Sequence, residues 1–184
     1  LTGEGYFSVT GDQKRPFLVK TTDLRIKVEG TSFNVSAYQN DEKIITTVEE
    51  GKVVLQRTNN KNQRKNVAEL TANMQSAFHK DAKTASVKQV NTKKYTSWKD
   101  GKLMLVDDPM LIVKKKLERW YNVDIEIQDP AVYEYTYTAT LTDEPIEQAM
   151  KYLSMAAPIS YEIRPGKKQD DNSFSRKKVL IGTK

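Results

Sequence analysis

The side chains with the most capacity for chemistry are one histidine and three pairs of adjacent carboxylates. His79 is the only histidine among 184 residues, and the chain has no cysteine. A histidine-based triad and a site with several histidine or thiolate ligands are therefore excluded, so a general base would have to be a carboxylate. The carboxylate pairs are Glu49-Glu50, Asp107-Asp108 and Asp170-Asp171. We expect His79 to be a surface residue before a turn.

Each carboxylate pair also has a structural role that its neighbours suggest. Glu49-Glu50 is followed by glycine, which is typical of a turn. Asp107-Asp108 could bind calcium, but Pro109 follows, and aspartate before proline is typical of a helix start. We therefore expect Asp108 to cap a helix and Asp170-Asp171 to lie in a solvated loop. The sequence predicts no catalytic, metal or cofactor site, and hence no enzyme.

The composition is that of a folded protein with a basic balance. Hydrophobic residues make up 38% of the chain and charged residues 29%, with a formal net charge of +6. The basic residues gather in four short clusters, at residues 61–65, 114–116, 167–168 and 176–178. Each cluster is near acidic residues or in a predicted loop, so no single basic stripe indicates nucleic-acid binding.

Neither a membrane-spanning segment nor a secretion signal is visible in the sequence. No run approaches the roughly 20 apolar residues that a transmembrane helix needs. The first residue is Leu1, not methionine. We therefore interpret the chain as a processed or excised part of a longer protein.

Residues 1–92 have the pattern of an all-β domain. Apolar residues alternate over short runs, with turn residues between the runs. Leu24, Ile26 and Val28 are expected to share one face, and Phe33 and Val35, with Ala37, another. Periodicity leaves two architectures open, a sandwich and a short β-solenoid. The polar segment 59–66 is predicted to be a loop between strands.

The pattern changes after a predicted linker at residues 93–101. Residues 102–184 are predicted to form strand, helix, strand twice over, an α+β domain of the small βαβ-βαβ kind. Met110, Val113 and Leu117 share one face of the first predicted helix, and Asn122 is expected to end it. The second helix has buried spacing at positions 146, 149, 150 and 153, with Thr142 or Asp143 as its candidate cap.

Three tyrosines and one tryptophan are the candidate partner-binding residues. Tyr133, Tyr135 and Tyr137 alternate with polar residues in a predicted strand, and a strand from a partner could add to it at a sheet edge. The same face could instead cover the helices, which suits Tyr137 best. Trp98 lies in the predicted linker, where we expect it to hold the two domains together.

Several short motifs carry a family resemblance. In the first half they are Gly30-Thr31-Ser32-Phe33-Asn34-Val35, Gly3-Glu4-Gly5-Tyr6-Phe7, Arg15-Pro16-Phe17-Leu18-Val19 and Thr47-Val48-Glu49-Glu50-Gly51-Lys52-Val53. In the second half they are Trp98-Lys99-Asp100-Gly101 and Leu117-Glu118-Arg119-Trp120-Tyr121-Asn122-Val123. Together they resemble the FecR family of sigma-factor regulators. The second set is similar to the domain that follows the FecR domain in Bacteroidota members.

The resemblance implies a periplasmic region of a regulator anchored in the inner membrane. Such a regulator is an anti-sigma factor that docks the N-terminal signalling domain of a TonB-dependent outer-membrane receptor. It relays the signal to an extracytoplasmic-function sigma factor through a cytoplasmic segment absent from this chain. The second domain is similar to the small domains called secretin and TonB short N-terminal (STN) domains. The alternative is a carbohydrate-binding module that uses exposed aromatic rings on the β domain.

Overall fold

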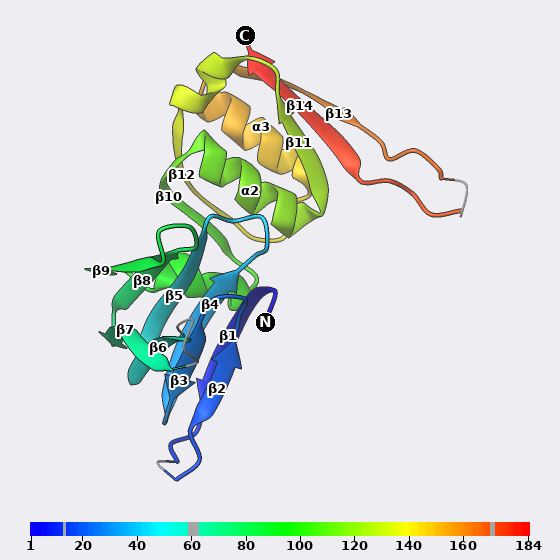
Figure 1. Ribbon diagram of the computed structural model, residues 1–184. Helices are drawn as coiled ribbons and strands as arrows, with labels where there is room; N and C mark the ends of the chain where they lie inside the picture. The colour runs from blue at the N-terminus through cyan, green and yellow to red at the C-terminus, as the bar shows by residue number, and fades with distance from the viewer. Residues whose placement is uncertain (13, 59–62, 170–171) are drawn as a thin grey trace. The chain divides into compact units, whose positions relative to one another are not determined.

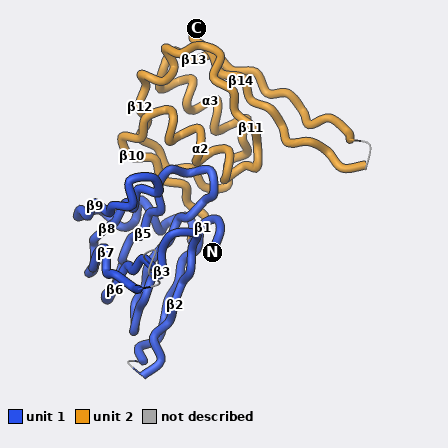
Figure 2. The backbone as a smooth tube through the Cα atoms, in the orientation of Figure 1, with its two compact units in different colours: residues 1–99 blue, residues 100–184 orange. Residues whose placement is uncertain are grey.

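The computed structural model describes residues 1–12, 14–58, 63–169 and 172–184, which form two compact units. Residues 1–99 make the N-terminal unit and residues 100–184 the C-terminal unit (Figure 2). Each unit encloses its own hydrophobic core. The fold is α+β, as the sequence predicted, with most of its helical structure in the C-terminal unit.

The strands of the N-terminal unit form two antiparallel sheets (Figure 1). The first sheet has the order β1-β4-β5-β8-β9, and the second has the order β2-β3-β6-β7. The strands are β1 (Gly3–Val9), β2 (Phe17–Lys20), β3 (Arg25–Val28), β4 (Thr31–Ala37), β5 (Lys43–Glu50), β6 (Lys52–Thr58), β7 (Arg64–Thr71), β8 (Met74–His79) and β9 (Thr84–Gln89).

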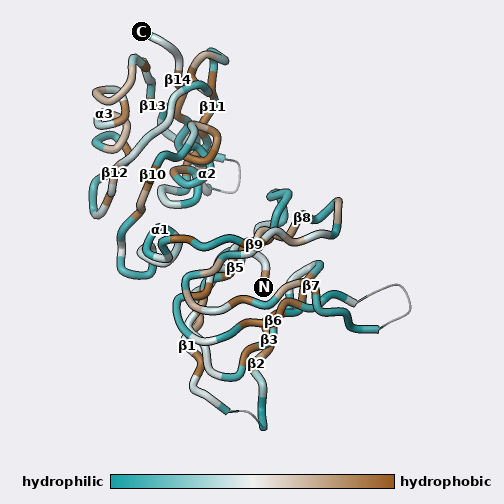
Figure 3. The backbone as a smooth tube through the Cα atoms, turned by 90° about the vertical axis from the view of Figure 1, so that its left-hand side faces the viewer, coloured by the Kyte–Doolittle hydropathy of each residue, from teal (hydrophilic) through white to brown (hydrophobic). Residues whose placement is uncertain are grey.

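One core takes side chains from both of these sheets, so the unit is a sandwich and not a solenoid. Phe33 and Phe78 come from the first sheet and Ile26 and Leu55 from the second, and all four are fully buried. The hydropathy colouring has brown stretches on strands such as β6, with polar residues at the turns (Figure 3). The predicted alternation at residues 24–28 and 33–37 is confirmed, because these apolar side chains all enter this core.

Gly51, between β5 and β6, occupies a position that only glycine fits. Its φ of +86° lies in the region that L side chains rarely adopt. A Cβ atom there would lie 2.5 Å from the carbonyl oxygen of Gly30. The glycine in the sequence after Glu50 is therefore fixed by backbone geometry.

The chain leaves the sandwich through two short helical turns. These are α1 (Lys93–Thr96) and the 3-10 helix η1 (Ser97–Asp100). Residues 93–99 belong to the N-terminal unit, where α1 contacts β4.

The C-terminal unit follows the predicted order of strand, helix, strand, repeated once, with a final strand. Its elements are β10 (Leu103–Pro109), α2 (Met110–Tyr121), β11 (Val123–Ile127), the 3-10 helix η2 (Pro130–Glu134), β12 (Thr136–Leu141), α3 (Ile146–Ala156), β13 (Ile159–Arg164) and β14 (Lys177–Thr183). The opening strands β10 and β12 pair antiparallel with each other. The closing strands β11 and β13 flank β14, which runs parallel to β11 and antiparallel to β13.

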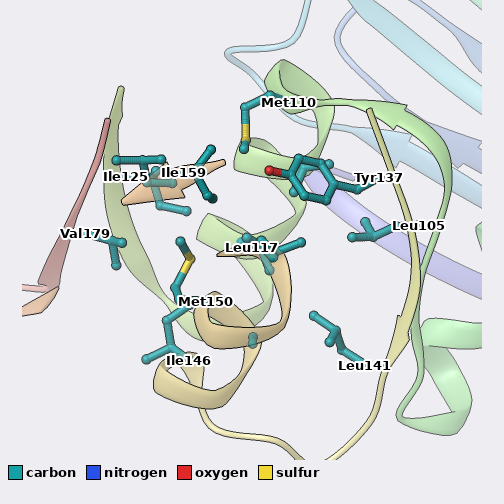
Figure 4. Packing of buried hydrophobic residues seen from close by; sticks show 14 of the residues in the cluster. Leu105, Met110, Leu117, Ile125, Tyr137, Leu141, Ile146, Met150, Ile159 and Val179 are labelled. Carbon is teal, nitrogen blue, oxygen red and sulfur yellow. The ribbon is translucent and has the colours of Figure 1, made fainter. Parts of the chain in front are cut away.

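Side chains from both small sheets meet the two helices in a single core. Figure 4 shows Leu105 and Tyr137 on one side and Ile125 and Val179 on the other, with Leu117 between them. The predicted buried stripes of both helices are confirmed. Asn122 ends α2 in the left-handed conformation with φ of 51°, as expected.

Both predicted helix caps are wrong. Pro109, not Asp108, occupies the N-cap of α2, and no side chain caps that helix. Asp108 stays in β10, opposite Tyr137, and its carboxylate accepts a 2.7 Å hydrogen bond from Lys116. Proline is also the N-cap of α3, at position 145. The two prolines hold the preceding chain extended, so neither Thr142 nor Asp143 reaches the helix start.

Candidate functional site

The residues with chemical potential are dispersed in the structure. His79 ends β8 before a turn, as expected, and is partly exposed. The Asp170-Asp171 pair lies outside the described residues. Within the described ranges, no three His, Cys, Asp or Glu side chains lie close enough to hold a metal ion. The structure therefore directs attention to surfaces on which a partner could bind.

A layer of polar side chains lies between the α1–η1 segment and the outer face of the first sheet, and both the segment and the sheet contribute to it. We call it the polar tier: Tyr6, Asn34, Glu49, Thr96 and Trp98. Asn34 alternates with the core residues of β4 and so points away from the core. It is nevertheless only 2% exposed. The α1–η1 segment buries it, because this segment covers a face that the alternation predicts to be wet.

Direct contacts hold the polar tier together. Trp98 Nε1 donates a 3.1 Å hydrogen bond to Asn34 Oδ1, and Asn34 Nδ2 donates a 2.7 Å bond to Glu4. The amide of Asn34 is therefore used at both ends, which suits a buried polar group. The hydrogen bond of Trp98 is internal to the N-terminal unit. It fixes η1 to the sheet at a defined point.

Glu49 is the second anchor of the polar tier. Its carboxylate accepts a hydrogen bond from the Tyr6 hydroxyl and lies 3.5 Å from Thr96 Oγ1 of α1. Burial, followed by this hydrogen bond, raises the pKa of Tyr6. Lys99 Nζ lies 5.1 Å from the centre of the Tyr6 ring, a cation–π distance. Glu49 thus lies in a strand and fastens α1, which the prediction of a turn did not anticipate.

The three tyrosines do not form one strand, which corrects the prediction for Tyr133 and Tyr135. Tyr133 lies in η2, Tyr135 caps the end of η2, and β12 begins one residue later at Thr136. The cause is the Asp129-Pro130 pair, which starts a helical turn instead of a loop. Asp129 Oδ1 accepts a 2.9 Å bond from the backbone amide of Ala131, the contact of an N-cap.

Two further contacts tie η2 to β14. Asp129 Oδ2 accepts a 2.5 Å hydrogen bond from Thr183 Oγ1, and the amide of Gln128 donates to the carbonyl of Ile181 at 2.8 Å. The Thr183 bond and the bond from the Ala131 amide lower the pKa of Asp129. Val132 is fully buried beneath the turn. This support presents Tyr133 outward, and it is 42% exposed.

The other two tyrosines lie deeper. Tyr137 is buried in the core, as expected from the alternative in which this face covers the helices (Figure 4). Its hydroxyl has no hydrogen-bond partner in the described structure. Tyr135 is half-buried, and its carbonyl accepts a 3.0 Å hydrogen bond from the amide of Met110. Of the three rings, Tyr133 is therefore the most accessible to a partner.

β12 offers a backbone edge next to Tyr133. Among the described strands it pairs with β10 only, so its second edge has no strand partner. A bulge lies in β10 between Leu105 and Asp108, and Asp107 adopts a left-handed conformation there with φ of 48°. Its amide and carboxylate bond to Thr138 Oγ1 at 3.0 and 3.2 Å. The bulge therefore fixes the register of β12 from the β10 side.

The feature expected of a carbohydrate-binding module is two or three coplanar exposed rings in a groove. Among the large exposed apolar residues described in the N-terminal unit, the single aromatic is Phe17, at 40% exposure. Its neighbour Phe7 is tilted by 50° to it and instead stacks on the buried Phe33. The described rings of the N-terminal unit thus provide no flat sugar platform.

Sequence reasoning missed Asn34, Glu49 and Asp129 as positioning residues. Asn34 and Glu49 stand at outward positions of alternating strands, so their burial depends on a segment some 50 residues further on. No local signal reveals that cover. The Asp129-Pro130 pair did carry a signal, because aspartate before proline is a typical start for a helical turn.

Two family models match the chain, one in each unit. The model described as "FecR protein" matches residues 1–54, and the model described as "FecR, C-terminal" matches residues 102–169. Together they span about two thirds of the chain. A comparison with curated protein sequences finds no significant match. No helix in the described ranges is long and apolar enough to span a membrane.

Two crystal structures are similar over the full length of the chain. Both are of a candidate anti-sigma factor from Parabacteroides distasonis ATCC 8503. The first, at 1.65 Å resolution, is 26% identical with a TM-score of 0.77, and the second, at 2.50 Å, is 28% identical with a TM-score of 0.74. In each case the match covers 100% of this chain and 78% of the other.

Proposed function

The chain belongs to the FecR family, and we propose that it is the periplasmic part of a membrane-anchored anti-sigma factor. In this proposal it has no enzymatic activity. It docks the N-terminal signalling domain of a TonB-dependent outer-membrane receptor. The parent protein then relays the signal across the inner membrane to an extracytoplasmic-function sigma factor. Both family matches and the similarity to the Parabacteroides structures support a regulatory role.

The observation that carries the docking proposal is the open edge of β12 beside Tyr133. A strand from the receptor domain would add to this edge through main-chain hydrogen bonds. Tyr133 would supply the side-chain contact, because tyrosine offers a large ring with little conformational entropy to lose. Tyr135 comes between Tyr133 and β12 in the sequence and is half-buried, so it would form the floor of the contact.

Trp98 has a positioning role in this proposal. Its hydrogen bond to Asn34 fixes η1, and β10 begins three residues after η1 ends. The polar tier therefore anchors the segment from which the C-terminal unit starts. Loosening it would leave the docking strand intact but weaken its connection to the sandwich.

A binding titration with a matched tyrosine pair tests the docking surface. Tyr133 is 42% exposed, and Tyr152 on α3 is 43% exposed, so Tyr152→Ala removes an equal ring elsewhere on the same unit. We expect Tyr133→Ala to weaken binding of the purified receptor signalling domain by at least about tenfold. Tyr152→Ala should change it by less than about twofold. Equal effects of the two substitutions would contradict the proposed surface.

Hydrogen exchange tests the strand addition separately. In the complex, amides of residues 136–141 should gain protection, while those of the edge strand β13, residues 159–164, should not. Protection at β13 alone would place the partner on a different edge. No binding to any receptor domain encoded beside the gene would reject the proposed function itself.

A further inference from the structure

Two hollows open at one end of the N-terminal sandwich, with volumes of about 370 and 330 Å³. They share Arg57 and Lys83 in their linings. The first extends along the ends of β6, β7 and β9 and adds Lys65. The second extends to the turn between β2 and β3 and adds Lys20 and Arg25. We call these five residues the basic end.

The basic end concentrates positive charge that the rest of the fold does not neutralise. Among the described residues that line either hollow, Asp23 is the only carboxylate, and it pairs with Lys83 at 2.6 Å. Lys20, Arg57 and Lys65 have no carboxylate partner within the described part of the chain. The described residues that line the two hollows thus include five bases and one acid, a net charge of +4.

The strand register places like charges directly opposite each other at two points of this end. Lys20 of β2 faces Arg25 of β3, and Arg57 of β6 faces Lys65 of β7. Like charges in such cross-strand pairs destabilise a sheet. Both pairs lie in the same four-stranded sheet. The two bases of each pair therefore repel each other in the folded unit, and one neutral substitution in each pair would remove this repulsion.

Arg25 also has an unmet hydrogen-bonding group. Its Nε atom is buried and has no partner among the residues that the structure describes. A buried donor without a partner costs free energy, about 1 to 3 kcal/mol by comparison with other proteins. An acceptor at the basic end would relieve this cost together with the repulsion between the paired bases.

We propose that the basic end is a binding site for a multiply charged phosphate. One guanidinium group can donate two parallel hydrogen bonds to two oxygens of a phosphate, and an ammonium group adds a point charge. Arg57 with Lys65 and Lys83 therefore forms a suitable donor set. Hollows of this size accommodate a small ligand. The phosphate could be free or carried by a lipid, and the chemistry recognised would be the same. This site is separate from the proposed docking strand.

Calorimetric titration with inorganic pyrophosphate tests the proposal on the whole chain. The variant Arg57→Gln/Lys65→Gln should weaken saturable binding by at least about tenfold. The control Lys27→Gln/Lys52→Gln removes the same charge from the same sheet, at residues that line neither hollow. It should weaken binding by less than about twofold. Equal weakening by both variants, or no saturable binding, would overturn the proposal.

Two more measurements separate this outcome from a folding defect. The Arg57→Gln/Lys65→Gln variant should melt at the same temperature as the unaltered chain or higher, because it relieves like-charge repulsion. Asp23→Asn should tighten pyrophosphate binding by about twofold or more, since it removes the one negative charge and releases Lys83. A weaker affinity for Asp23→Asn would count against the site.

A vesicle assay identifies the source of the phosphate. If the site takes a lipid phosphate, vesicles that contain phosphatidic acid, whose phosphate monoester can carry two charges, should bind the chain, and pyrophosphate should displace them. If it takes a free phosphate, pyrophosphate should bind while the vesicles do not. Vesicle binding that pyrophosphate leaves unchanged would place the membrane contact elsewhere and reject the basic end as its site.

Discussion

The two units differ in net charge and in how completely their bases are paired. Residues 1–99 contain 17 bases and 10 acids, a net charge of +7, and residues 100–184 contain 13 bases and 14 acids, a net charge of −1. In the C-terminal unit, surface bases pair with acids across or beside strands, in Arg164–Glu162, Arg176–Asp124, Lys177–Glu147 and Lys178–Glu126. In the N-terminal unit, Lys83 of the basic end pairs with Asp23, but Lys20, Arg57 and Lys65 have no carboxylate partner among the described residues. The positive balance of the chain is therefore a property of the sandwich.

The two cores differ in a related way. Each contains buried hydroxyls without a hydrogen-bond partner in the described structure. In the sandwich these belong to Thr46 and Ser76, which do not titrate. In the C-terminal unit these hydroxyls belong to Tyr121 and Tyr137, which lose a proton at alkaline pH. We therefore expect the two units to respond differently to alkaline pH.

The largest expected effect comes from removing one core side chain in each unit. Phe33→Ala in the sandwich and Leu117→Ala in the C-terminal unit should each lower the free energy of unfolding by about 3 to 5 kcal/mol. Trp98 lies in one unit and Trp120 packs against the core of the other, so fluorescence can report each separately. We expect Phe33→Ala to shift the Trp98 transition in urea. It should leave the Trp120 transition in place.

The control for that measurement is a single-tryptophan background. Trp98→Phe and Trp120→Phe each leave one reporter, and the two core variants are then compared in both. If either core substitution moved both transitions by the same amount, the units would unfold together. The N-terminal and C-terminal units would then differ in their surfaces but not unfold as independent units.

The second largest effect tests the polar tier. Asn34→Ala should lower the free energy of unfolding of the sandwich by about 2 kcal/mol, because it removes the hydrogen bonds that Asn34 makes with Trp98 Nε1 and Glu4. Hydrogen exchange of residues 93–99 should speed up in the same variant. Ser36→Ala, on the same face of β4 but outside the tier, is the matched control. Slow exchange at 93–99 in Asn34→Ala would show that α1 is held by other contacts.

How far the sequence predicts this molecule depends on the range of the interactions involved. Alternation predicted the buried faces of β3 and β4, because a strand's own residues determine which side is apolar. Helical spacing predicted the stripe through Met110, Val113 and Leu117 for the same reason. The N-caps of the two helices were misjudged by one to three residues, because proline restricts the residue before it as well as starting the helix.

The candidate sites were harder to predict because residues distant in sequence build them. The basic end takes residues from β2, β3, β6, β7 and the turn before β9, and no two neighbours in the sequence show it as a cluster. The polar tier requires α1 to fold over β4. The sequence left open whether Tyr133 binds a partner or covers the helices, and the structure exposes it in a helical turn instead of a strand. Composition could suggest these surfaces, but only the register between strands assembles them.

A smaller effect concerns the buried tyrosine hydroxyls. Tyr137→Phe should raise the free energy of unfolding of the C-terminal unit by about 1 kcal/mol at neutral pH, since it removes an unpaired buried hydroxyl. Burial raises the pKa of Tyr137 and of Tyr121 to about 12, from about 10 in the unfolded chain. The folded state thus disfavours the ionised form. Stability from this source is complete below pH 10 and is lost as the pH rises from 10 to 12.

Urea unfolding monitored by Trp120 between pH 9 and pH 12 checks that sign. The free energy of unfolding should decline less steeply with pH in Tyr137→Phe than in the unaltered chain, and least steeply in Tyr121→Phe/Tyr137→Phe. The Trp98 transition should be unaffected by both substitutions. An equal slope in all three proteins would mean that lysine deprotonation, and not tyrosine ionisation, controls the alkaline behaviour of this unit.

The smallest effect should come from the surface ion pairs of the C-terminal unit. Lys178 Nζ lies 2.6 Å from Glu126, but both side chains are about half exposed, so solvent screens the attraction. The hydrogen bond from Lys178 lowers the pKa of Glu126, so any stability it gives is present at neutral pH and is lost as the pH falls below the usual range of a glutamate. Lys178→Gln should therefore shift the melting temperature by less than about 1 °C at pH 7.

Arg57→Gln in the sandwich removes the same charge as Lys178→Gln, yet it should raise the melting temperature. Arg57 faces a base across the sheet, whereas Lys178 faces an acid. Calorimetry of the two variants at low salt compares the units directly, and a lower melting temperature for Arg57→Gln would show that the bases of the basic end stabilise the sandwich instead of repelling one another.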